Sequence, residues 1–147
     1  TYMYAYSGEH YKIADKVRYI NNELYTDEPD GLSGNEDCGQ MSAWYILSSM
    51  GFYPVNPSNG AYVFGSPLFD EVSLNIPGQN KFKISAKNNS DENIYIQSVS
   101  LNGEDYKYSY ITHKQILKGG ELKFVMGPNP NKNFGTEKKY RPKSIVY

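Results

Sequence analysis

The densest group of side chains that could do chemistry lies in the stretch DGLSGNEDCGQMSAWY, residues 30–45. Asn35, Glu36, Asp37 and Gln40 place two carboxylates and two amides close together there, with a glycine on each side. A carboxylate fixed near the start of a helix can act as the base that activates a water. The amides could orient that water or a cation, and the glycines would let a ligand approach the backbone closely. This stretch is therefore the first candidate for a catalytic site.

Two other interpretations of the same acids stay open. Asp37 followed by Gln40 matches a capping box, in which Asp37 would be the N-cap of a helix and Gln40 would return a hydrogen bond. A calcium loop of the EF-hand type is a poor match, because Thr26 would take the first ligand position and Pro29 would stiffen the coordinating turn. The capping and catalytic interpretations are compatible, since a cap uses only one carboxylate oxygen.

Helical patterns lie on both sides of this loop. Ile13, Val17, Ile20 and Leu24 recur at spacings of three and four residues, which predicts an amphipathic helix of about three turns. A second helix is predicted over residues 37–50. Because its apolar side chains cover more than one stripe, we expect this second helix to be buried on most sides.

The hydrophobic period changes to two after residue 56. The alternating residues are Val72, Leu74, Ile76, Phe82, Ile84, Ala86, Val99, Leu101, Leu122, Phe124 and Met126. Turn-forming sequences separate these runs, so we expect the alternating side chains to face one core. The prediction is an α+β chain, with a helical hairpin in residues 1–56, a small antiparallel β-sheet or half-sandwich in residues 57–133, and a polar tail in residues 134–147.

Charge and composition exclude several function classes. The formal net charge of −1 argues against nucleic-acid binding, which needs a basic face. No apolar run is long enough to span a bilayer. Cys38 is the single cysteine and has no histidine near it in the sequence, so it is predicted to be a packing residue rather than a nucleophile. His10 and His113 stand alone in polar sequence and are predicted to lie on the surface, whereas Trp44 is predicted to lie in the core.

Several segments resemble, in the same order, the C-terminal end of the family-92 glycoside hydrolases, which are calcium-dependent α-mannosidases. These segments are YMYAYSG, ELYTDEPDGLSGNEDCGQMSAWYILSSMGFYPV, YVFGSPLFDEVSLNI, IQSVSLNG and YITHKQILKGGELKFVMGPNPN. The run over residues 34–44 is the most specific, and the resemblance extends to about residue 133. It implies a longer parent protein with an N-terminal β-sandwich and an (α/α)6 barrel, of which the helical hairpin would be the end.

The resemblance also implies a mechanism. Family members remove terminal mannose with inversion, which requires a general acid at the leaving oxygen and a base that activates a water across the ring. Asp37 matches the family's base, and Asn35 stands where a number of members carry a second aspartate, so Asn35 would orient the water. Glu36 and Gln40 are candidate substrate-binding residues. The glutamate that serves as the family's general acid has no counterpart in these 147 residues, so the isolated chain is expected to be inactive.

The remaining expectations also follow from the resemblance. Calcium is the implied cofactor, with ligands mostly upstream of Thr1. The implied partners are mannose-containing glycans, with α-1,2 linkages in mannan or N-glycans as the expected target, and the rest of the catalytic barrel. The implied location is periplasmic, extracellular or at the cell surface of a bacterium.

Self-association is expected on physical grounds. Apolar helix faces that the β region cannot cover would make the isolated chain associate. In that case we expect the Tyr2–Tyr6 segment to be frayed or packed across the interface.

A carbohydrate-binding or structural β-module is the alternative from another function class. Tyr95, Tyr106, Tyr108 and Tyr110 could supply stacking faces for sugars. An open cleft at the two adjacent acids would favour the enzyme, because a base needs access to its water. Covered acids would instead indicate a structural cap.

Overall fold

The computed structural model describes residues 1–78 and 80–144, and it confirms the α+β class. Its helices are α1 (Tyr4–Ser7), α2 (Lys12–Glu23), α3 (Gln40–Ser49) and α4 (His113–Leu117). Its strands are β1 (Phe52–Asn56), β2 (Ala61–Phe64), β3 (Glu71–Asn75), β4 (Lys81–Lys87), β5 (Tyr95–Leu101), β6 (Glu104–Asp105), β7 (Tyr110–Thr112) and β8 (Gly120–Gly127). Among the described residues, no helix is both long and apolar enough to cross a membrane.

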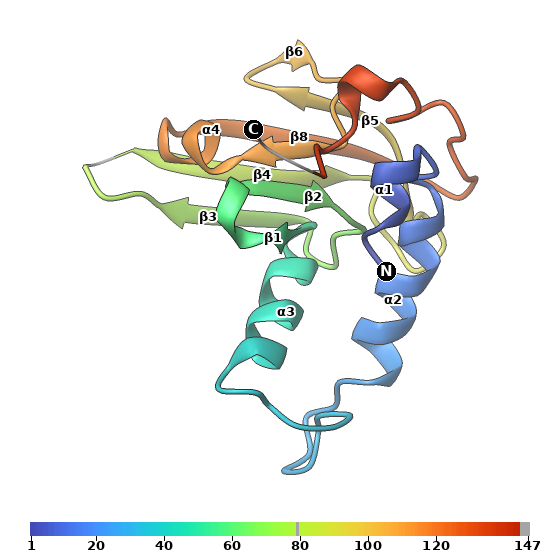
Figure 1. The fold of residues 1–147 in the computed structure, drawn as a ribbon, viewed down its shortest axis with the longest axis vertical. Coiled ribbons are helices and arrows are strands. Elements are labelled where there is room, and N and C mark those ends of the chain that lie inside the picture. The colour runs from blue at the N-terminus through green and yellow to red at the C-terminus, as the bar shows by residue number, and fades with distance from the viewer. Residues whose placement is uncertain (79, 145–147) are drawn as a thin grey trace.

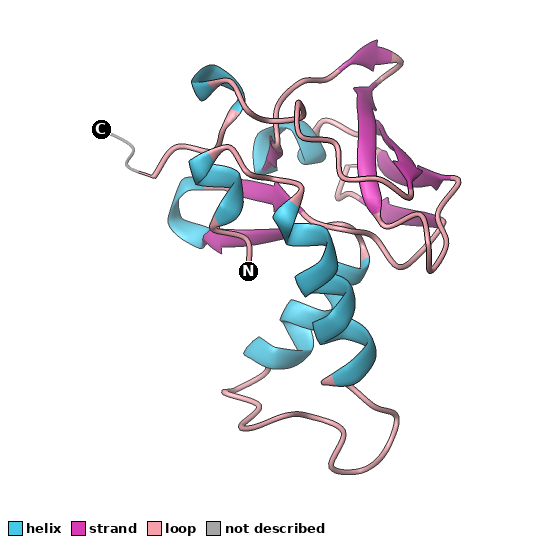
Figure 2. Ribbon diagram, turned by 90° about the vertical axis from the view of Figure 1, so that its right-hand side faces the viewer, coloured by secondary structure: helices cyan, strands magenta, loops and turns pink. Residues whose placement is uncertain are grey.

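The strands form two sheets, from which the hairpin of α2 and α3 projects (Figures 1 and 2). The smaller sheet is antiparallel, in the order β1-β2-β7, and the larger has the order β3-β4-β8-β5-β6. The expectation of an antiparallel sheet fails at one pair, since β4 and β8 run parallel, from Phe82 opposite Gly120 to Lys87 opposite Val125. Parallel pairing requires a crossover connection, which here contains β5, β6, β7 and α4.

The main hydrophobic core lies in the β region and has the composition that alternation predicts. Phe64 of β2 meets Phe124 of β8 edge to face, with ring centroids 5.2 Å apart. The predicted core residues either belong to this cluster or pack against it. They are Val72, Leu74, Ile76, Phe82, Ile84, Leu101, Leu122 and Phe124.

The hairpin is fastened to the β region through Arg18 of α2. Its Nε donates to Ser66 Oγ at 2.9 Å, and its Nη2 donates to Pro67 O at 2.6 Å and also to Asn89 Oδ1. These partners satisfy a guanidinium that is largely removed from water. Loss of Arg18 would leave buried oxygens without donors, so this contact fixes the direction in which α2 leaves the sheets.

The N-terminal segment is ordered and packed, so the expectation of fraying at Tyr2–Tyr6 is wrong. The ring of Tyr2 is buried in a second cluster with Ile13, Val17 and Val63, and its hydroxyl donates to Ser48 Oγ at 2.9 Å. Burial raises the pKa of Tyr2, so its hydroxyl stays a donor. The segment therefore joins α2, α3 and β2 within one chain.

His10 is buried, which corrects the prediction that it lies on the surface. Its side chain is 4% exposed, and its Nε2–H donates to Phe64 O at 3.0 Å. The ring also meets Phe134 edge to face, with centroids 5.0 Å apart. Burial lowers the pKa of His10 to about 4, so the imidazole is neutral at pH 7. His113 lies at the surface, as predicted.

Candidate active site

The predicted site residues lie on the loop that joins the far ends of α2 and α3, away from the sheets (Figures 1 and 2). The first half of the loop is a tight turn, in which Thr26 N–H donates to Gly31 O at 2.9 Å and Tyr25 forms a β-bridge with Leu32. The second half carries Asn35 to Gly39 and runs into α3. The loop therefore presents its polar residues at one end of the molecule.

Three successive residues in this loop have a left-handed backbone. Asp37, Cys38 and Gly39 have φ values of 51°, 58° and 91°. A left-handed conformation costs a residue with a Cβ roughly 1–2 kcal/mol, although aspartate tolerates it better than most. Two such residues in a row are strained, and strain of this kind concentrates at functional sites. The strained turn therefore supports the prediction that this segment is a functional site.

The turn overturns the capping interpretation of Asp37. Helix α3 begins at Gln40, and its N-cap is Gly39, which has no side chain that could cap it. A left-handed residue cannot be part of a right-handed helix, so α3 cannot extend back to Asp37. A true capping box does occur elsewhere, where Thr112 caps α4 and Gln115 returns the hydrogen bond.

The side chain of Asp37 is exposed, as are those of Asn35, Cys38 and Gln40. The prediction that Cys38 packs inside is therefore wrong, because the left-handed turn carries it outward. Gln40 Nε2 donates to Tyr53 Oη at 3.0 Å, which ties the start of α3 to β1. The two residues predicted to handle a water, Asn35 and Asp37, are thus both accessible to solvent.

Glu36 differs from its neighbours because it is half-buried. Its Oε1 accepts the Ser42 N–H at 3.2 Å, in the first turn of α3. Its Oε2 is covered from water and finds no hydrogen-bond donor within the described part of the chain. The backbone of Glu36 also holds the turn, since its carbonyl oxygen accepts the Met41 N–H at 3.2 Å.

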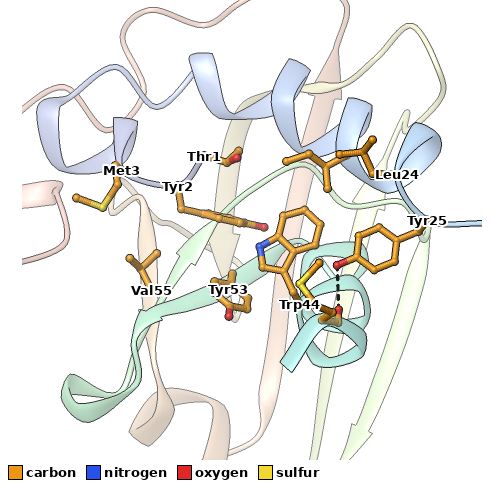
Figure 3. A pocket seen from close by; sticks show the side chains of 10 residues that line it. Thr1, Tyr2, Met3, Leu24, Tyr25, Trp44, Tyr53 and Val55 are labelled. Carbon is orange, nitrogen blue, oxygen red and sulfur yellow. Dashed lines mark hydrogen bonds between the residues drawn. The ribbon is translucent and has the colours of Figure 1, made fainter. Parts of the chain in front are cut away.

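An aromatic cleft of about 370 Å³ lies between the N-terminal segment, α2, α3 and β1 (Figure 3). Tyr25 stacks on Trp44 with centroids 5.8 Å apart and an interplanar angle of 5°, and Tyr2 stacks on Tyr53 at 5.6 Å. Trp44 is half-buried at this cleft, so the prediction of a core residue is only partly correct. The Tyr25 hydroxyl donates to Met41 O at 3.0 Å, shown by the dashed line in Figure 3.

The sequence interpretation missed Tyr25 and Tyr53. Each holds the first turn of α3, Tyr25 through Met41 and Tyr53 through Gln40. Burial and the nearby carboxylate of Glu36 raise the pKa of Tyr25, which keeps its hydroxyl protonated as a donor. Nothing in the spacing of two aromatic residues, one at the end of a helix and one in a strand, indicates that they meet.

The described residues do not form a metal site by themselves. Within residues 1–78 and 80–144, no three His, Cys, Asp or Glu side chains gather closely enough to hold an ion. The acids in the first half of the loop, Asp27, Glu28 and Asp30, are exposed and dispersed. This arrangement argues against the EF-hand interpretation and does not fit a calcium site built from this chain alone.

The tyrosines proposed as sugar platforms are used for packing in the β region. Tyr108 lies against Tyr106, Tyr110 and Tyr140, with centroid distances of 5.4, 5.7 and 5.2 Å. The Tyr95 hydroxyl donates to Asp15 on α2. These rings stabilise junctions between elements, so they give little support to the alternative of a carbohydrate-binding module.

Comparison with known proteins gives consistent matches along the chain. The glycosyl hydrolase family 92 catalytic domain matches residues 1–128. A family GH92 α-mannosidase from Bacteroides thetaiotaomicron, solved in complex with mannoimidazole, is 39% identical over 98% of this chain, with a TM-score of 0.92. A family GH92 inverting mannosidase from the same organism is 40% identical over 97% of the chain, with a TM-score of 0.91.

A curated relative extends the matches to a eukaryote. An uncharacterized secreted glycosidase of Arthroderma benhamiae is 31% identical over 99% of this chain. The chain spans only 19% of the length of this relative, and 19% of each of the two bacterial enzymes. These proteins therefore carry about four-fifths of their residues outside the region that is similar to this chain.

Proposed function

The chain belongs to glycosyl hydrolase family 92, and we propose that it is the C-terminal part of an inverting, exo-acting α-mannosidase, in which Asp37 is the general base. The observation that carries this proposal is the position of Asp37. Its carboxylate is exposed on a strained left-handed turn, inside the segment that most resembles the family. Two of the similar structures are an α-mannosidase and an inverting mannosidase, which supports the proposed substrate and stereochemistry.

In the proposed reaction, Asp37 takes a proton from a water that attacks the anomeric carbon. The amide of Asn35, two residues away, orients that water without a second negative charge. Gln40 lies at the start of α3, where its side chain, held by Tyr53, can contact the sugar or the water. The general acid that protonates the leaving oxygen comes from outside residues 1–147, so the isolated chain does not hydrolyse mannosides.

Calcium is proposed as a cofactor of the longer protein rather than of this chain. In this proposal its ligands come mostly from residues upstream of Thr1. The proposed substrates are mannan or N-glycans with terminal α-1,2-linked mannose. The proposed location is outside the cytoplasm, in the periplasm or at the surface of a bacterium, which agrees with the secreted nature of one relative.

The test uses the longer protein that contains this sequence. It is incubated with α-1,2-, α-1,3- and α-1,6-linked mannobiose, with calcium or with a chelator, and the anomeric protons of released mannose are followed by NMR. We expect β-mannose to appear first, fastest from the α-1,2 substrate and only with calcium. If α-mannose appears first, the inverting mechanism is wrong, and if no mannose is released, the proposed activity is wrong.

A further inference from the structure

We propose that Glu36 is a positioning residue, which fixes the direction of Asp37 by locking the left-handed turn onto the first turn of α3. This inference rests on the proposed role of Asp37 as the base. It assigns to Glu36 a different role from contact with the sugar, which the sequence alone suggested. The argument depends on where the two carboxylate oxygens of Glu36 lie.

One oxygen of Glu36 is engaged by the backbone and the other is covered. Oε1 is used by the Ser42 N–H at 3.2 Å, and Oε2 is covered from water. By contrast, the adjacent side chain of Asp37 is exposed. Two neighbouring acids of the same loop therefore have opposite environments, and only Asp37 can reach a water or a sugar.

The contacts of Glu36 close the turn on both sides. Its side chain reaches over Asp37, Cys38 and Gly39 to Ser42, and its backbone oxygen accepts the Met41 N–H. A further bond within the turn, from Gln40 N–H to Asp37 O at 3.3 Å, completes the closure. The first N–H groups of a helix have no partner within the helix, so the carboxylate satisfies one that would otherwise stay open.

The turn needs this support because its conformation is unfavourable. Asp37 and Cys38 are both left-handed, and such a backbone persists only where its surroundings hold it. Release of the Glu36 carboxylate would let the turn relax and would swing the carboxylate of Asp37 away from its water. A displacement of about 1 Å in a catalytic group can lower the rate by about 100-fold.

Two conservative substitutions in the longer enzyme separate positioning from other roles. Glu36→Gln keeps the side-chain length and an oxygen that can accept the Ser42 N–H, but it removes the charge. Glu36→Asp keeps the charge but is one methylene too short to reach Ser42. We expect kcat of the Asp variant to fall by about 30- to 100-fold with KM little changed, and kcat of the Gln variant to stay within about fivefold of wild type.

The opposite order would overturn the proposal. If Glu36→Asp is active and Glu36→Gln is not, the charge of Glu36 matters rather than its bond to Ser42. If both variants raise KM together, Glu36 contacts the substrate, and if both retain full kcat, Glu36 has no role in activity. Asp30→Asn, in an exposed acid of the same loop, is the matched control and should keep wild-type kinetics.

Two further measurements serve as controls for this interpretation. The melting temperature of each variant shows whether a loss of kcat follows from a loss of folded protein. Asp37→Asn, assayed in parallel, tests the proposed function itself. If Asp37→Asn keeps its activity, the assignment of Asp37 as the base is wrong. If Asp37→Asn is inactive but both Glu36 variants keep full kcat, only the positioning role of Glu36 is wrong.

Discussion

The β region and the helical hairpin are built in opposite ways. The sheets enclose a continuous core in which Phe64, Phe82, Leu122 and Phe124 are completely buried. Helix α3, in contrast, buries only small polar residues, and Ile46 on its surface is 52% exposed. The residues proposed for catalysis are all on the hairpin, at the end that lies farthest from the sheets (Figure 1).

This difference separates the part of the chain that provides stability from the part for which we propose a catalytic role. Side chains in the sheets gain free energy by burial, about 25 cal/mol per Å² of apolar surface. The left-handed backbone at Asp37 and Cys38 instead lowers the stability of the folded chain. Substitutions in the two regions should therefore affect different measurements, and the following predictions are ordered by their expected effect on the free energy of unfolding.

The largest effect is expected in the β core. Phe124→Ala removes a fully buried ring that packs on Phe64, and this should lower the free energy of unfolding of the chain by about 3–5 kcal/mol. Urea denaturation followed by circular dichroism measures this change. Phe69→Ala, at a side chain that is largely exposed, is the control and should change stability by less than about 1 kcal/mol. Equal effects would mean that the β core is not the source of stability.

A smaller effect, which depends on pH, is expected from His10 at the junction of the two regions. Its pKa is about 4 in the folded chain and about 6.5 when unfolded, so the unfolded state takes up the proton first as the pH falls. The stability that His10 contributes is complete above pH 6.5 and is lost on acidification towards pH 4. Between pH 6.5 and 5.0 the loss should be about 1.5 kcal/mol.

The variant His10→Gln tests this prediction. It cannot titrate in this range, so its free energy of unfolding should fall less between pH 6.5 and 5.0 than that of the wild type. If the two pH profiles run parallel, the imidazole is not buried in its neutral form.

The next effect in size separates strain from chemistry. Gly39 has φ = 91° and Gly103 has φ = 84°. A Cβ added at Gly39 would meet Glu36 Oε1 in ordinary contact at 4.0 Å, and one added at Gly103 would meet nothing within 4 Å. An alanine at either position should therefore cost about 1–2 kcal/mol of stability. In the longer enzyme, only Gly39→Ala should also lower kcat, because Gly103 lies in a turn between β5 and β6. A loss of kcat in both variants would show that general destabilisation, not the turn, controls activity.

The exposed apolar surface of the hairpin gives a prediction with little effect on folding. Four large apolar side chains are exposed in the first 56 residues: Met3, Tyr19, Leu24 and Ile46. We expect the isolated chain to self-associate at micromolar concentration, and Ile46→Ser to weaken this while changing stability by less than about 0.5 kcal/mol. Leu117→Ser, on α4, should leave association unchanged. Sedimentation velocity measures the association state of each chain, and a monomeric wild type would contradict the prediction.

The sequence predicted those features that depend on local pattern. Alternation identified β3, β4, β8 and the end of β5 with their buried faces, including Phe82, Leu122 and Phe124, because the period of two is fixed by the pleat. It did not identify β1, β2, β6 or β7, and α4 lies within the region that was predicted to be sheet. The parallel pairing of β4 with β8 was not predictable in this way. Pairing direction depends on how the chain returns over the intervening residues 88–119, and no local period records that path.

The candidate site shows the same limit. The polar composition of the loop located it, and the resemblance gave a role for Asp37, but the turn itself was hidden. Propensity favoured a helix that starts at Asp37, whereas tertiary contacts of Glu36 and Tyr25 hold a left-handed turn and begin α3 at Gln40. The burial of His10 was missed for a related reason, because its partners Phe64 and Phe134 lie far away in the sequence.

The most direct test of the account is Asp37→Asn in the longer enzyme, with kcat, KM and the melting temperature measured together. Asparagine adopts the left-handed conformation readily, so the turn should survive and the melting temperature should stay unchanged. Because the amide cannot accept the proton of the attacking water, kcat should fall by about 100- to 10,000-fold with little change in KM. A variant that keeps kcat within about threefold of wild type would contradict the account, since general-base catalysis contributes at least about 100-fold. A parallel loss of kcat and melting temperature would also contradict it, because Asp37 would then serve structure rather than chemistry.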